Sequence, residues 1–176
     1  REVIRCNAGQ TWTWDGVRFE VLHPDLADYG QTKTSNGLSC VLRIDAAHGD
    51  LAQLNQAAGG ASALLTGDIE SAQEHALLQK QALQSVDFLL VPHHGSLTSS
   101  GFDFVQQLMP KWAVVQAGYR NRYGHPSPQV VARYAQLGVP LAMSPVCGAA
   151  HWQSQTPQAL DCERNLKRRY WHFKAP

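Results

Sequence analysis

Two short segments of this chain end in side chains that bind divalent metals. Residues 64–68 (LLTGD) form an apolar run that stops at a carboxylate, and residues 91–95 (VPHHG) form one that stops at two imidazoles. Residues at the ends of two neighbouring buried strands can converge, and carboxylate and imidazole together form a metal ligand set. The interval between Asp68 and His94 leaves room for one helix between the strands. These segments therefore predict half of a metal site.

Asp68 is the predicted carboxylate ligand, and His94 is the predicted imidazole ligand. Asp68 follows Gly67, where the backbone can turn sharply and direct the carboxylate into a cleft. Its alternative role is the N-cap of a helix that begins near Ile69, and its two oxygens allow both roles at once. Adjacent residues of a strand point to opposite faces, so we expect one histidine in the site and His93 behind it or on a phosphate. The alternative for either ring is a core histidine bonded to a backbone carbonyl.

The segment that follows the two histidines is rich in hydroxyl groups. Ser96, Thr98 and Ser99 offer hydroxyls and backbone amides just before a predicted helix. The N-terminus of a helix is a favourable place for phosphate, so we expect these residues to contact an anionic substrate. The alternative is that they only cap the helix and form a turn.

A second polar loop, residues 118–127 (GYRNRYGHPS), lies between a predicted strand and a predicted helix. Arginine and asparagine beside a metal cleft suit an anion such as a phosphodiester, which predicts Asn121 and Arg122 as substrate-binding residues. His125 is a candidate general acid for the leaving oxygen, or a phosphate contact. The alternative is a solvated loop in which Gly124 and Pro126 provide the turns.

The elements that must hold these residues follow from the hydrophobic pattern. An Asp-Gly pair at 15–16 predicts a hairpin, and Ser127 followed by proline predicts the start of a helix. Strands dominate the first third and strand alternates with helix in the middle, which indicates one α/β domain over residues 1–176. The predicted strands are 3–6, 17–22, 38–45, 61–66, 86–92, 112–117, 141–144 and 149–153; the predicted helices are 71–84, 102–109 and 127–137; residues 48–60 are a predicted loop.

The composition indicates a soluble globular domain. Of the 176 residues, 44% are hydrophobic and 16% are charged, and the net charge of +1 gives no overall field that would attract nucleic acid. No apolar run is long enough to span a membrane, and we find no signal peptide. The basic and aromatic tail at 164–174 fits a terminal strand better than a nucleic-acid contact.

The segments LLTGDIE, VPHHGSLTSS and GYRNRYGHPSPQVVARY occur in that order, together with CNAGQTWTWDGVRFEVLHP and SNGLSCVLRI. The chain thereby resembles, over most of its length, the C-terminal metallo-β-lactamase-like domain of ComEC-type DNA-internalisation competence proteins. The resemblance implies the C-terminal part of an αββα sandwich, with a mixed sheet and helices on its outer face. It also implies two Zn²⁺ or Mn²⁺ ions bridged by Asp68, and metal-dependent hydrolysis of DNA phosphodiesters.

The same resemblance implies a setting for the domain. The parent would be a protein of the inner (cytoplasmic) membrane that takes up single-stranded DNA. This domain would lie on the periplasmic or extracellular side, with the rest of the membrane channel protein as its partner. No transmembrane segment is expected within the chain itself.

One family feature is missing from the chain. The superfamily has an H-x-H-x-D-H or H-x-D-x-D-H motif near its start, and no two of the eight histidines here are two or three residues apart. We therefore expect that the first half of the domain lies outside this chain and that the isolated chain binds metal weakly and is inactive. The alternative is a non-catalytic module that binds DNA or a partner and carries a degenerate metal site.

The four cysteines, Cys6, Cys40, Cys147 and Cys162, form no C-x-x-C pair, which argues against a structural zinc site. The strand pattern makes Cys6 and Cys40 potential neighbours, and the other two bracket a terminal excursion. If the domain matures outside the cytoplasm, as the resemblance implies, we expect the disulfides Cys6–Cys40 and Cys147–Cys162. Four free buried cysteines remain the alternative.

Overall fold

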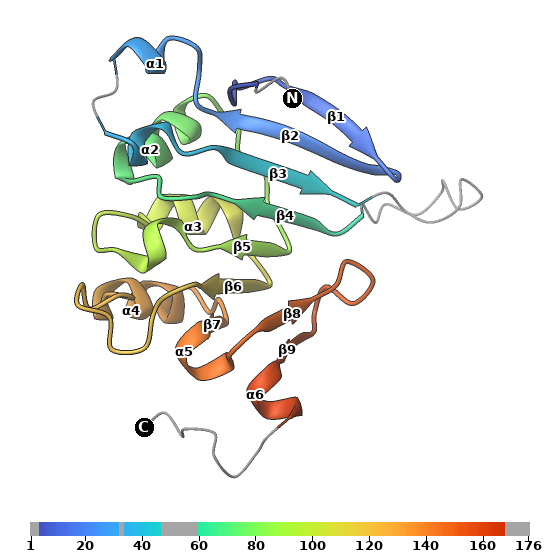
Figure 1. Ribbon diagram of the computed structural model, residues 1–176, viewed down its shortest axis with the longest axis vertical. Helices are drawn as coiled ribbons and strands as arrows, with labels where there is room; N and C mark the ends of the chain where they lie inside the picture. The colour runs from blue at the N-terminus through green and yellow to red at the C-terminus, as the bar shows by residue number, and fades with distance from the viewer. Residues whose placement is uncertain (1–3, 32–33, 47–59, 168–176) are drawn as a thin grey trace.

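A single seven-stranded sheet forms the centre of the computed structural model, which describes residues 4–31, 34–46 and 60–167. The strands lie in the order of the chain, and β1 to β4 pair antiparallel whereas β4 to β7 pair parallel (Figure 1). The strands are β1 Thr11–Trp14, β2 Val17–His23, β3 Val41–Asp45, β4 Ser62–Leu65, β5 Phe88–Leu90, β6 Trp112–Val115 and β7 Leu141–Met143.

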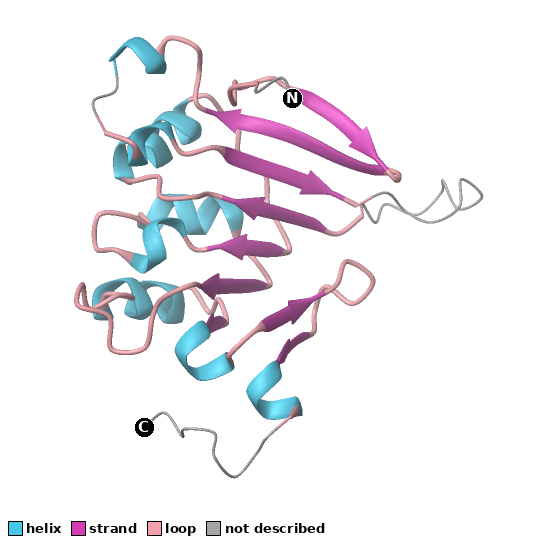
Figure 2. Cartoon of the chain, in the orientation of Figure 1, coloured by secondary structure: helices cyan, strands magenta, loops and turns pink. Residues whose placement is uncertain are grey.

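Three helices connect the parallel strands and lie along one face of the sheet (Figure 2). They are α2 Ser71–Gln79, α3 Phe102–Leu108 and α4 Pro128–Gln136. The shorter elements are α1 Asp28–Gln31, α5 Ser144–Cys147, α6 Glu163–Leu166, the 3₁₀ turns η1 Asn36–Leu38 and η3 Pro92–Gly95, and a hairpin of β8 Ala150–Trp152 and β9 Leu160–Cys162. None of the helices in the described part of the chain has the length and apolar character needed to cross a bilayer.

The hydrophobic core lies between the sheet and these helices. Alternate residues of the parallel strands meet apolar residues of α2, α3 and α4, which explains why these strands are apolar runs in the sequence. The largest contributors, each at most 1% exposed, are Leu64, Leu77, Leu89, Phe104, Leu108 and Tyr134.

The opposite face of the sheet is also apolar, and we call it the open sheet face. Cross-strand partners lie on the same side of a sheet, and one row of partners runs from β1 to β6. The row is Trp12, Phe19, Ile44, Ala63, Phe88 and Trp112. The β8–β9 hairpin covers one end of this face, where Trp152 contacts Phe88. At the other end the face is bare, with Trp12 45% exposed and Trp14 70% exposed.

The structure confirms the α/β class and a mixed sheet with helices against one face. Besides the seven-stranded sheet and one layer of helices, the described residues form only the two-stranded β8–β9 sheet, so the full second sheet and the second helix layer of an αββα sandwich are not among them. The hairpin predicted at Asp15 and Gly16 is confirmed, since both residues have the positive φ of a two-residue turn, 49° and 76°.

Several predicted boundaries are wrong. Residues 4–6 of the strand predicted at 3–6 are not in a strand, because Cys6 is linked to Cys40 and its carbonyl accepts the Tyr29 hydroxyl instead of a strand partner. Helix α2 ends at Gln79, before Gln81 with its φ of 53°. Residues 164–166 end α6 instead of forming a strand. The rest of the tail from 168, and residues 47–59 of the predicted loop, lie outside the described residues.

Both predicted disulfides are confirmed. Cys6 and Cys40 are bonded with their Cα atoms 6.0 Å apart, and Cys147 and Cys162 are bonded with theirs 4.6 Å apart. The first bond ties the segment before β1 to the start of β3. The second ties α5 to the end of β9 and so holds the hairpin against the rest of the fold.

Candidate functional site

The predicted ligands meet at one edge of the sheet. Strands β4, β5 and β6 are parallel, so their carboxyl ends share an edge (Figure 1), and this is where open α/β sheets bind ligands. Asp68 follows β4, the two histidines follow β5, and His125 lies in the loop after β6. His94 Nε2 is 3.4 Å from Asp68 Oδ1, and the His93 ring centre is 6.5 Å from that of His94 and 5.9 Å from that of His125.

A sharp turn at Gly67 places Asp68. Gly67 has a φ of 56°, and a Cβ there would be 2.9 Å from Ser39 Cβ, so both its backbone conformation and its surroundings favour glycine. The Asp68 backbone N–H donates to Ser39 Oγ at 3.1 Å, which fixes the residue against the segment before β3. The N-cap of α2 is Glu70, so the alternative capping role for Asp68 is wrong.

The two histidines do not continue a strand. Their φ values are 48° and 55°, so they form a left-handed turn in which both rings reach the same edge of the sheet. The strand geometry assumed for these two residues is therefore wrong, whereas the choice of His94 as the ligand, with His93 behind it, stays a prediction. Left-handed backbone is unfavourable outside glycine and persists only where contacts hold it. One such contact is the His93 N–H, which donates to Gly67 O at 3.0 Å.

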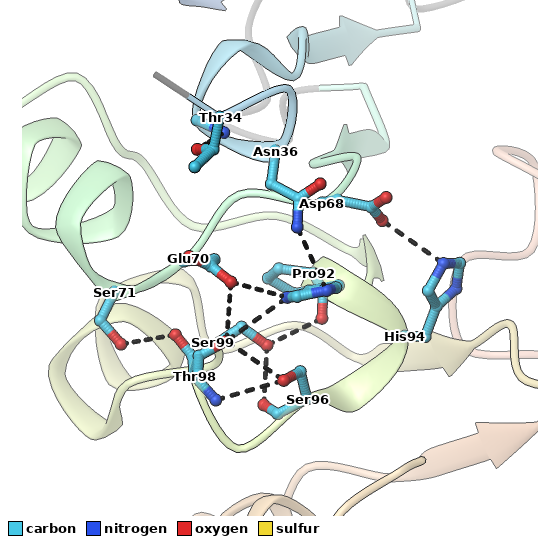
Figure 3. A network of polar contacts seen from close by, with 12 residues as sticks. Thr34, Asn36, Asp68, Glu70, Ser71, Pro92, His94, Ser96, Thr98 and Ser99 are labelled. Carbon is cyan, nitrogen blue, oxygen red and sulfur yellow. Dashed lines mark hydrogen bonds and ion pairs between the residues drawn. The ribbon is translucent and has the colours of Figure 1, made fainter. Parts of the chain in front are cut away.

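His93 is held from both sides of its ring by Glu70 and Asn36, both labelled in Figure 3. Its Nδ1 is 3.2 Å from Glu70 Oε1, and its Nε2 is 3.3 Å from the amide nitrogen of Asn36. The amide donates, so Nε2 accepts and Nδ1 carries the hydrogen that goes to the carboxylate. The sequence prediction gave no role to Glu70 or Asn36. Asn36 is distant from His93 in the chain and meets it only in the folded structure.

His94 has the same arrangement. Its Nδ1 is 2.7 Å from the backbone carbonyl of Gln116, so Nδ1 carries a hydrogen, and in the neutral ring the lone pair is on Nε2, which faces Asp68 (Figure 3). Histidines that bind metals usually donate their other N–H to a carboxylate or a backbone carbonyl. Both rings therefore have the hydrogen-bonding pattern of metal ligands, in which Nε2 is the nitrogen that would bind the metal.

The number of side chains available to bind a metal is nevertheless small. In the described part of the chain, no three His, Cys, Asp or Glu side chains are arranged so that they could hold a metal ion. The site offers Asp68 and His94 directly, and His93 only if Asn36 releases its Nε2. Further ligands would have to come from outside the described residues.

A buried carboxylate supports the loop after the histidines. Glu74, in α2, is 2% exposed and accepts the backbone N–H groups of Ser100 and Gly101 at 2.5 and 2.8 Å. Burial raises the pKa of Glu74, and these two hydrogen bonds and nearby Arg133 oppose that rise. The sequence prediction missed this residue, because nothing in a helical pattern distinguishes a buried glutamate from a solvated one.

The hydroxyls predicted to bind phosphate differ in availability. Ser99 is 1% exposed and donates to the carbonyls of Pro92 and Ser96, so it stabilises the turn instead of facing solvent. Ser96 is 7% exposed, and its Oγ lies 3.1 Å from the Thr98 hydroxyl. Thr98 is exposed and donates to Glu70 Oε1 at 3.0 Å. Of the three, only Thr98 is placed to meet a substrate.

The loop after β6 is organised by Asn121. Its amide nitrogen donates to the carbonyls of Gly118 and His125 at 3.0 and 2.6 Å, and its Oδ1 accepts the His125 N–H at 3.0 Å. Asn121 is therefore occupied in positioning His125, and the predicted phosphate contact is not available to it in this arrangement. Arg122 is exposed and donates to the Tyr123 hydroxyl at 2.7 Å.

His125 completes the group of three imidazoles. Its Nδ1 is buried and has no hydrogen-bond partner among the described residues. Desolvation lowers the pKa of His125, and the nearby His93 and His94 lower it further. A lowered pKa leaves the ring neutral at pH 7, so it would act as an acid only if a bound anion raised that pKa again.

His23 lies apart from this site. It is 5% exposed, and its Nε2 is 2.9 Å from the carbonyl of Gly37, so it is a core histidine.

Comparisons with known proteins give a consistent result. Competence protein ComA of Neisseria gonorrhoeae is 38% identical over 84% of this chain. ComE operon protein 3 of Bacillus subtilis is 36% identical over 65% of the chain, and Recombination protein 2 of Haemophilus influenzae is 33% identical over 73%. The matched segments are 19%, 13% and 14% of these relatives, so the chain spans less than a fifth of their length. No family model matches the chain.

Proposed function

Because the chain is homologous to ComEC-type competence proteins over most of its length, we propose that it takes part in DNA uptake. We further propose that its sheet edge is part of a metal-dependent site for hydrolysis of DNA phosphodiesters. The observation that carries the second step is the convergence of Asp68 and His94, whose Nε2 faces the carboxylate while Nδ1 is fixed by Gln116.

The residues present fit part of the shell of Zn²⁺ or Mn²⁺. Asp68 and His94 would hold the metal, and His93 would join them once Asn36 releases its Nε2. Bound ions would lower the pKa of water and stabilise negative charge on the phosphate. Glu70 and Gln116 orient the imidazoles, and Asn121 positions His125 beside them. Thr98, Arg122 and His125 are the groups available to contact the substrate phosphate.

The open sheet face supports a second layer of structure on that side. Two sheets that pack face to face bury exactly such a row of inward side chains. We propose that a second β-sheet covers this face and completes the αββα sandwich of the metallo-β-lactamase fold. The two disulfides support a location outside the cytoplasm, where such bonds persist.

Metal titration tests the site. Isothermal titration with Mn²⁺ and Zn²⁺ should show weak binding by the chain, since closed sites use about four ligands. Asp68→Ala and His94→Ala should each weaken that binding at least about tenfold, because each removes a ligand. His151→Ala is the matched control, since His151 pairs with Glu163 away from the site. Unchanged binding in Asp68→Ala would overturn the metal proposal.

The alternative is a non-catalytic module that binds DNA or a partner protein. It is favoured by the small donor set in the described residues and by the bare end of the open sheet face. The two functions differ in one measurement. If metal-loaded protein cleaves single-stranded DNA and Asp68→Ala does not, the hydrolase is supported. DNA binding without cleavage under the same conditions supports the module.

A further inference from the structure

A pocket of about 270 Å³ lies beside Asp68 and His94, and its walls suit a ligand other than a metal ion. It shares His94 and His125 with the site, and the rest of its lining comes from the end of β6 and the following loop. These residues are Gln116, Ala117, Gly118, Asn121 and Tyr123. None of these lining residues carries a carboxylate.

Planar groups dominate this loop. The Tyr123 ring is stacked on the His125 imidazole, with centroids 5.8 Å apart and planes within 19°. The guanidinium carbon of Arg122 is 4.9 Å from the centre of the same ring. Tyr123 still exposes 66% of its surface. The guanidinium lies over the ring, and exposed aromatic rings and guanidinium planes are the two kinds of group on which proteins stack unpaired bases.

The loop is already shaped for a ligand. Besides the three hydrogen bonds of its side chain to Gly118 and His125, Asn121 accepts the Gly124 N–H through its carbonyl at 3.1 Å. A wall that is ordered in advance reduces the entropy lost on binding. Arg120 and Arg122 are both exposed on this loop and supply positive charge for flanking phosphates.

We propose that this pocket receives one unpaired nucleobase of a single-stranded nucleic acid, stacked on Tyr123. The inference rests on the proposed function, since a phosphodiester at Asp68 and His94 brings the adjoining base to a pocket that shares His94. A base in a duplex is already paired and stacked, so it would enter only after unpairing. The pocket therefore selects single strands over duplexes.

Fluorescence anisotropy in EDTA tests the pocket without any contribution from metal. The probes are a labelled oligothymidylate, a strand of equal length with abasic sites, and a duplex. The oligothymidylate should bind about tenfold more tightly than the abasic strand and the duplex, since stacking one base contributes about 1–3 kcal/mol. Tyr123→Ala should remove this difference, and Tyr123→Phe should keep it because the ring remains. Trp14→Ala, which removes a 70% exposed ring on β1, is the control.

Two results would overturn the base pocket: equal binding of the base-bearing and abasic strands, or equal losses in Tyr123→Ala and Trp14→Ala. Asp68→Ala should keep the base-dependent binding, since EDTA has already removed the metal. Base-dependent binding without any metal-dependent cleavage would overturn the hydrolase alone. Cleavage that is indifferent to Tyr123 would overturn the base pocket alone.

Discussion

Replacing Glu74 is the most direct test of how the site is held in place. This carboxylate is 2% exposed and joins α2 to the loop after the histidines through the N–H groups of Ser100 and Gly101. Arg133, from α4, donates to the carbonyl of Ser99 at 3.2 Å, in the same loop. Glu74→Ala removes the acceptor of the two backbone N–H groups.

The cost of Glu74→Ala follows from these contacts. A buried donor left without an acceptor costs about 1–3 kcal/mol, and Glu74→Ala leaves two such N–H groups. We therefore expect a loss of about 4 kcal/mol in the free energy of unfolding, which corresponds to a fall of roughly 10 °C in Tm. His75→Ala, at an exposed position of the same helix, should change stability by less than about 0.5 kcal/mol.

The pH dependence gives a second readout for the same residue. Burial raises the pKa of Glu74 above its ordinary value of 4.5, so in that range the folded state binds more protons than the unfolded state. Stability from this residue is therefore present below pH 4.5 and declines as the pH rises through the folded pKa. Glu74→Gln removes this titration.

Urea unfolding between pH 4 and pH 8 measures the difference in stability between wild type and Glu74→Gln. We expect that difference to shift against the wild type as the pH rises. A difference that stays constant or moves in favour of the wild type would refute the assignment of a raised pKa. A loss below about 1 kcal/mol in Glu74→Ala would refute the supporting role of the carboxylate.

The remaining predictions concern the stability and surface of the fold. Replacing both cysteines of Cys6–Cys40 by serine should cost about 4 kcal/mol in urea unfolding, and the same change at Cys147–Cys162 should cost about 3 kcal/mol. The first bond closes the longer loop, since the sequence separations are 34 and 15. A larger loss from the second replacement would contradict this. Gly95→Ala should cost about 3 kcal/mol of stability, since its φ is 78° and a Cβ would lie 2.6 Å from Pro126 Cβ. Gly124→Ala should cost about 1 kcal/mol, because Gly124 has a similar φ of 67° but open space around it. Equal losses in the two variants would exclude the steric cause. Exposed apolar patches promote association, so Trp14→Lys, which places a charge on the open sheet face, should reduce self-association in sedimentation velocity without loss of stability. An unchanged sedimentation profile would count against association through this face.

The middle of the fold was predictable because its signals are local. Buried runs of apolar residues predicted β4, β5 and β6, and the intervening helices followed from helical spacing and from Ser127 before proline. The hairpin at Asp15 was predictable because an Asp-Gly pair is suited to a two-residue turn. The placement of Asp68 and His94 at neighbouring strand ends followed from the same pattern.

The detailed geometry of the site was not predictable, because contacts distant in the chain determine it. His93 and His94 adopt left-handed backbone although neither position is a glycine or an asparagine, the residues that usually indicate it. Glu70 and Asn36 hold the His93 ring, and Asn36 is 57 residues away from it in the chain. The argument from strand alternation failed because it assumed strand backbone at both histidines, which instead form a left-handed turn.

The alternation in β2 predicts burial on a side that stays exposed at the neighbouring strand β1 in the described residues. Its polar residues Arg18 and Glu20 lie on the helix side, in a groove with Arg43 and Asp45, whereas Phe19 and its partners lie on the open sheet face. Antiparallel strands place their apolar residues toward a core, and a shift of one residue would reverse every side chain. The pattern therefore supports the proposed covering layer on the open sheet face. A second sheet there would cover the exposed rings of Trp12 and Trp14.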